Sequence, residues 1–171
     1  MRVRSVLLAA AFAAAAGRAS AQLVFDGVRW QAGRVENGRV AAWQEVKVVT
    51  QAPPKLTDRL RAHLFLKNPG THPEEGVLIR FSMTARLVPS DAAVAGAWAI
   101  PFAVDEKRVP YVAPGKTVEV VLDASPALDL YLRRLARAGW WPDRLKMQVM
   151  LEPHPGAASI KTAEDVVEFS K

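Results

Sequence analysis

Cysteine is absent from the 171 residues of this chain. Its absence excludes disulfide bonds, thiolate metal sites and cysteine nucleophiles. It also excludes a blue-copper centre, the metal site that a β-sandwich could otherwise carry, because that centre needs a cysteine thiolate. A small domain without disulfides must be held together by its hydrophobic core alone. Half of the residues are hydrophobic, which is enough for one such core.

Long apolar runs are also lacking, except for a short one near the N-terminus. The uncharged run Val6–Ala16 follows two arginines and precedes the small residues Ala19-Ser20-Ala21. This order predicts a cleavable signal peptide over residues 1–21, with the mature chain beginning at Gln22. A run of about eleven residues is too short to cross a bilayer as a helix. We therefore expect an exported protein, periplasmic or extracellular, with no transmembrane segment after the signal is removed.

Excess charge is small once the predicted signal peptide is set aside. The whole chain carries a formal charge of +6, and three of its arginines lie before Gln22, which leaves +3 on residues 22–171. So small a charge does not indicate a nucleic-acid partner. The sequence also has no Gly-x-x-x-x-Gly-Lys phosphate loop and no Gly-x-Ser-x-Gly nucleophile turn. The 150 residues of this segment fit a single domain.

Alternating apolar and polar residues cover most of the mature chain, and this pattern is typical of strands with one buried face. It is clearest in five segments: 60–67, 77–88, 98–104, 118–123 and 145–151. Weaker strands are expected at 22–30, 45–51 and 159–169, whereas 35–42 has no clear pattern. The alternation, together with one helix, places the following residues in the core: Phe81, Met83, Trp98, Ile100, Val120, Leu132, Leu135, Met147 and Val149.

One segment, about 126–138, has helical spacing instead. Ser125 is the expected N-cap, Pro126 suits the first turn, and Gly139 suits the left-handed position after the helix. Apolar residues recur every three or four positions from Leu128 to Leu135 and form a stripe that can pack on a sheet. We therefore predict an all-β, immunoglobulin-like antiparallel sandwich of seven or eight strands with one crossover helix.

Two turn-forming segments support this fold. Leu66-Lys67-Asn68-Pro69-Gly70 ends one predicted strand, and Ala113-Pro114-Gly115-Lys116-Thr117 opens another. Together they resemble the turns of bacterial secreted immunoglobulin-like domains, over roughly residues 58–123. The resemblance implies a fold and, loosely, a binding or structural role. The helix departs from that pattern because it is longer than the usual crossover of such domains.

The candidate contact surface lies at the end of the predicted helix. Arg133, Arg134 and Arg137 fall on its polar side, and Trp140 and Trp141 follow Gly139 directly. A large aromatic side chain beside arginines is the usual composition of a protein-binding hot spot. One tryptophan is expected to seal the helix against the sheet while the other points elsewhere. We interpret the chain as a non-catalytic domain that binds a protein of the cell envelope or the exterior.

Two alternatives remain open from the sequence. Exposed tryptophans could make the chain a carbohydrate-binding module, with Trp98 expected in the core. A hydrolase would need converging carboxylates, for which Glu119, Asp123 and Glu152 are the candidates. The three histidines indicate no metal site or cofactor: His63 is expected to point outward between cations, and His72 and His154 to lie in solvated turns.

Overall fold

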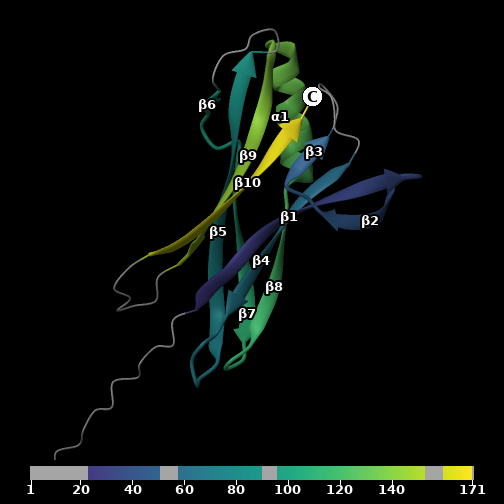
Figure 1. Ribbon diagram of the computed structural model, residues 1–171. Helices are drawn as coiled ribbons and strands as arrows, with labels where there is room; N and C mark the ends of the chain where they lie inside the picture. Colours follow the sequence, from purple (N-terminus) through teal and green to yellow (C-terminus); the bar gives the residue numbers. More distant parts are fainter. Residues whose placement is uncertain (1–22, 51–57, 90–95, 153–159, 171) are drawn as a thin grey trace, which may run out of the picture.

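The computed structural model describes residues 23–50, 58–89, 96–152 and 160–170, and it is a sandwich of two β-sheets with one helix (Figure 1). The predicted signal peptide, residues 1–21, lies outside the described residues. The all-β sandwich with one crossover helix is therefore confirmed. The described ranges hold ten strands rather than seven or eight. Arg39–Glu45 forms a strand that no alternation had indicated, and the expected strand 98–104 is divided between Ala97–Trp98 and Ala103–Val112.

The smaller sheet has four antiparallel strands in the order β2-β1-β4-β8. Its strands are β1 (Val24–Glu36), β2 (Arg39–Glu45), β4 (Arg59–Lys67) and β8 (Thr117–Asp123). β1 and β2 form a hairpin whose turn, Asn37-Gly38, has positive φ angles of 52° and 77°. Asn-Gly is the preferred pair for such a tight turn. This dipeptide therefore indicates a hairpin in a segment that shows no clear alternation.

The larger sheet has six strands in the order β3-β10-β9-β5-β6, and β7 also pairs with β5. Its strands are β3 (Val48–Thr50), β5 (Glu74–Pro89), β6 (Ala97–Trp98), β7 (Ala103–Val112), β9 (Trp140–Leu151) and β10 (Lys161–Ser170). All pairs are antiparallel except β3 with β10, which is parallel. β1 packs against β10 between the two layers.

Most of the predicted core residues lie between the two sheets. The buried ones are Phe81, Met83, Val120, Leu132, Leu135, Met147 and Val149. The alternation of β4 is also confirmed, since Leu60, Ala62, Leu64 and Leu66 are all buried. Burial of this set is the main stabilising contribution to a domain without disulfides.

Trp98 and Ile100 were expected in the core and are exposed, at 42% and 84% of their surface. The alternation from Trp98 to Val104 correctly suggested an extended segment, but that segment lies at the margin of the larger sheet. Trp98 pairs only with Arg86 of β5, and the chain then passes through Pro101 to the next strand. Of this segment, Phe102 packs against the core and stacks on Tyr131 with ring centroids 4.4 Å apart.

Helix α1 (Ser125–Arg137) links β8 of the smaller sheet to β9 of the larger one. The capping residue is Ala124 and not Ser125, which is the first helical residue. Ala124 is fully buried and its N–H donates to the carbonyl oxygen of Leu60, so this position ties the helix to β4. Gly139 has a φ of 75°, as expected for the residue that ends the helix. Asp129 pairs with Arg59 of β4 at 3.1 Å.

Candidate functional site

The helix-end surface consists of four residues of α1, Leu130, Arg133, Arg134 and Arg137, together with Trp140. In a helix, residues three, four and seven positions apart lie on one face, so the four helical residues form a single stripe. All four are exposed, with Leu130 at 53%. The opposite stripe of the helix is buried against the sheets through Leu128, Leu132 and Leu135. The burial of one face therefore fixes which residues the helix presents outward.

Positive charge on this surface is not neutralised. Within the ranges that the structure describes, none of Arg133, Arg134 and Arg137 forms an ion pair. Elsewhere arginines do pair, for example Arg29 with Glu45 at 3.4 Å. Arg134 and Arg137 lie in the last turn of α1, where a cation interacts favourably with the helix dipole. The interaction with the helix dipole concerns only Arg134 and Arg137. It does not occupy their guanidinium groups, which stay accessible to a partner.

The two adjacent tryptophans lie on opposite sides of strand β9. Trp141 is only 3% exposed and packs edge-to-face on Phe169, with centroids 6.4 Å apart. It belongs to the core and is removed from the candidate contact residues. Trp140 is 41% exposed and remains on the helix-end surface. Of the two rings, Trp141 is therefore the buried one and Trp140 the exposed one.

A second exposed apolar surface runs along β6 and the start of β7. It is formed by Trp98, Ile100 and Val104, the last of which is 74% exposed. The Lys146 ammonium lies 4.7 Å from the centroid of the Trp98 ring, a cation–π contact on the outer face of the larger sheet. Val104 also lines a groove of about 500 Å³ on that face. Sequence reasoning missed this surface because its alternation looks like that of a buried strand.

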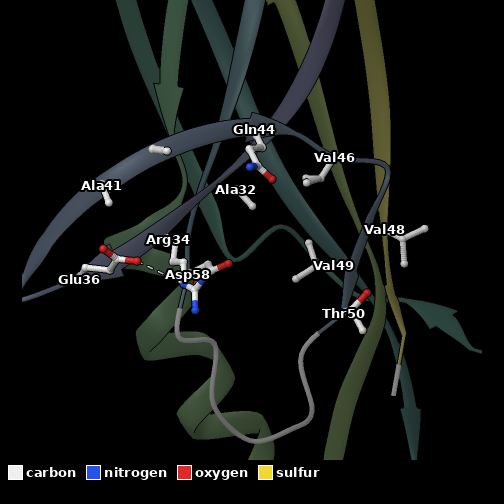
Figure 2. A pocket seen from close by; sticks show the side chains of 11 residues that line it. Ala32, Arg34, Glu36, Ala41, Gln44, Val46, Val48, Val49, Thr50 and Asp58 are labelled. Carbon is white, nitrogen blue, oxygen red and sulfur yellow. Dashed lines mark ion pairs between the residues drawn. The ribbon is translucent and has the colours of Figure 1, made fainter.

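A cavity of about 600 Å³ lies between the edges of the two sheets (Figure 2). One wall comes from β1 and β2, with Ala32, Ala42 and Gln44, and the other from β3, with Val49. At one end the charged residues Arg34, Glu36 and Asp58 line the cavity, and Arg34 and Glu36 are 3.6 Å apart. No local sequence pattern indicates this cavity, because it depends on how the two sheet edges face each other.

His63 does not point freely into solvent as the sequence analysis expected. It is 5% exposed, and its Nδ1 hydrogen-bonds to the Glu119 carboxylate of β8. The reason is its central position: β4 lies between β1 and β8, and the cross-strand neighbours of His63 are Arg29 and Val121. His72 is exposed and contacts the Thr71 hydroxyl at 3.1 Å, whereas His154 lies outside the described residues.

The candidate carboxylates of a hydrolase do not converge. Glu119 and Asp123 lie four positions apart on β8, which separates them by about 13 Å along the strand. Glu152 lies beside the other sheet and pairs with Arg80 at 3.6 Å. Among the described residues there is no group of three metal-ligating side chains. Glu119, Asp123 and Glu152 therefore form no pair of facing carboxylates, and Glu119 pairs instead with His63.

Among the described residues, Arg86 and Tyr131 have clearly shifted pKa values, and both shifts have structural causes. A hydrogen bond from the Arg86 guanidinium to Asp143 raises the pKa of Arg86, and this pair connects β5 to β9. Burial raises the pKa of the Tyr131 hydroxyl, whose ring stacks on Phe102. Neither residue lies in one of the two cavities described above.

The exposed aromatic residues Trp98, Tyr111 and Trp140 take part in neither of the two ring pairs among the described residues. The two ring pairs among the described residues, Phe102–Tyr131 and Trp141–Phe169, both belong to packed parts of the fold. Trp98 and Trp140 lie on different strands, β6 and β9, and neither lines one of the two cavities. No observation on these rings favours a carbohydrate-binding module over a protein-binding domain.

Helix α1, with 13 residues, is the one helix in the described ranges, and it is neither long nor apolar enough to span a membrane.

No family model matches the sequence, and no curated protein matches it either. Among solved structures, a β-glucosidase from Erythrobacter marinus is similar at 14% identity and a TM-score of 0.38; the match covers 87% of this chain and 15% of the enzyme. A protein from Archaeoglobus fulgidus is similar at 12% identity and a TM-score of 0.36; that match covers 86% of this chain and 99% of the other. Likeness at this level assigns no family and no activity.

Proposed function

We propose that this chain is an exported, non-catalytic domain that binds another protein of the envelope or the exterior through its helix-end surface. The observation that carries the proposal is the presence of three unpaired arginines beside two exposed apolar side chains, Leu130 and Trp140. Arginine and tryptophan are the residues that most often dominate binding energy at protein interfaces. An uncompensated positive surface selects a partner with acidic residues at the matching positions.

Charge reversal on the helix tests the proposal. Arg134→Glu and Arg137→Glu should each reduce capture of an acidic envelope protein by about tenfold at low salt, because attraction becomes repulsion. The difference from wild type should shrink as salt rises, since exposed charges are screened within about 10 Å at 0.1 M salt. Capture is measured by pull-down with the tagged chain from the extract of its native envelope.

Two controls separate charge from folding. Arg108→Glu reverses an exposed arginine on β7, away from α1, and should capture the same protein as wild type. Reversal in the last helical turn costs about 0.3–1 kcal/mol through the helix dipole, so melting temperatures should change little. Recovery of the same protein by all three variants would place the binding surface elsewhere.

Export is a separate part of the proposal, and it depends on the N-terminal segment alone. A basic start, an uncharged apolar run and a small-residue cleavage site support it. Sequencing the N-terminus of the protein from its native host should find Gln22 as the first residue. An intact Met1 on the main species would mean that the segment is not a cleaved signal.

A further inference from the structure

The outer edge of β2 presents backbone groups that no strand of the described residues pairs, because β2 is the last strand in the order of its sheet. The Val46 N–H donates to the Trp30 carbonyl oxygen at 2.9 Å. In an antiparallel ladder, hydrogen-bonded pairs alternate with pairs whose N–H and C=O groups point away from each other. Val46 and Trp30 form a hydrogen-bonded pair, so the next pair along the ladder, Glu45 with Gln31, is of the second kind. Two positions further on, Trp43 with Gly33 is of the second kind as well. The N–H and C=O groups of Trp43 and Glu45 therefore point toward the open edge.

The middle of β2 lacks the devices that normally keep a sheet edge from pairing. The charges of β2 lie at its two ends, Arg39 and Glu45, and Val40–Gln44 carries no charge and no proline. By contrast, β7 has four consecutive charged residues, Asp105–Arg108, followed by Pro110. Charges and proline are the usual means of blocking an edge, and their absence leaves β2 able to accept a strand. A register shift at the Arg34/Val35 position of β1 interrupts the hairpin, but Ala42–Glu45 lies in the regular part of the ladder.

The hairpin also extends beyond its support. The pairing of β1 with β4 stops at Gly33, opposite Arg59, so 34–42 forms a two-stranded ribbon that projects from the body of the sandwich (Figure 1). An isolated two-stranded hairpin is at best marginally stable in water, and a third strand is normally needed. A third strand paired with β2 would stabilise the ribbon.

The cavity beside the ribbon suits the side chains of an added strand. Figure 2 shows Ala32 and Gln44 on one side and Val49 on the other, with open space between β2 and β3. Every second side chain of a strand points to the same face, so alternate residues of an added strand could enter this space. The lining combines alanine and valine with polar residues, so it suits small side chains, whether apolar or polar. The polar lining residues are Arg34, Glu36, Gln44, Thr50 and Asp58.

We propose that β2 accepts an extended segment of the acidic partner, which adds to the smaller sheet as an antiparallel strand. This inference depends on the proposed function, because the helix-end surface has only five residues and a stable interface uses about 20–30 on each side. The two surfaces are connected through the Arg59–Asp129 ion pair: Asp58 lines the cavity, and Asp129 lies one helical turn before Arg133. The edge and its cavity carry two bases, Arg34 and Arg39, and three acids, Glu36, Glu45 and Asp58, so selection of an acidic partner rests on the helix-end surface.

A matched pair of variants at Glu45 tests the proposal. Glu45→Pro removes an N–H that points to the open edge, at a position where proline is tolerated in edge strands. Glu45→Gln keeps that N–H and removes only the exposed ion pair with Arg29. With the partner purified after capture by the wild-type chain, Glu45→Pro should weaken binding at least tenfold, while Glu45→Gln should stay within about twofold.

Hydrogen exchange provides a readout that does not depend on whether the proline variant folds. In the complex of the wild-type chain with the purified partner, the Trp43 and Glu45 amides should exchange at least tenfold more slowly than in the free chain. Unchanged exchange, or equal binding by both Glu45 variants, would overturn strand addition. If Arg134→Glu still loses binding in that case, the helix-end surface binds the partner and strand addition to β2 does not occur. Slow exchange of these amides in the chain alone, with a dimer in sedimentation, would identify a second copy as the occupant and overturn the proposal.

Discussion

Trp141→Ala is expected to destabilise the protein by about 3–5 kcal/mol, the range for removing a buried large aromatic side chain. Trp141 is 3% exposed and packs edge-to-face on Phe169, so alanine would leave a cavity between β9 and β10 and remove that contact. The loss is measured as the change in the free energy of unfolding in urea.

The neighbouring residue is the natural control for this prediction. Trp140 is 41% exposed, so Trp140→Ala should lower the free energy of unfolding by about 1–2 kcal/mol, clearly less than Trp141→Ala. The same substitution should weaken capture of the partner, because Trp140 belongs to the helix-end surface. Equal destabilisation by the two variants would show that the faces of β9 are wrongly assigned.

Phe81→Ala is expected to cost about 3–5 kcal/mol as well, because Phe81 lies in the middle of β5 and is 7% exposed. Its neighbour Ser82 faces the outer side of the same strand, between Val104 of β7 and Gln148 of β9. Ser82→Ala should therefore stay within about 0.5 kcal/mol. Denaturant melts of both variants measure the difference, and similar losses at the two positions would contradict the alternation of β5.

The parts of the fold that local patterns determine could be predicted from the sequence. The alternation in β4 and β5 requires only that one face be buried, and the structure buries that face. Helix α1 was found within one residue at each end, because its apolar spacing and Gly139 are local signals. Its cap was not found, because the choice between Ala124 and Ser125 depends on contact with Leu60 of β4, which is distant in the sequence.

The errors arise where burial depends on neighbours that are remote in the sequence. Ile100 has the pattern of a core residue, but it follows an edge strand of two residues and is exposed. His63 shows the opposite error: it lies on the outer side of β4 and is buried, because β4 is central in its sheet and Glu119 binds the ring.

The candidate site was predictable in part for the same reason. Helical spacing alone placed Arg133, Arg134 and Arg137 on the open face of α1, and the structure leaves all three exposed. The choice between Trp140 and Trp141 depends on the register of β9 with β5, which no local pattern determines. The open edge of β2 and its cavity depend on the relative position of two sheets, so they were visible only in the fold.

The most direct test of the account is the affinity of the purified partner for the double variant Arg134→Glu, Arg137→Glu, measured over a range of salt concentrations. The account predicts an acidic partner whose affinity for the wild-type chain falls as salt rises, and whose affinity for the double variant is at least tenfold weaker at low salt. An affinity and a salt dependence that are the same for both chains, with both folded, would contradict the claim that the helix-end surface binds the partner.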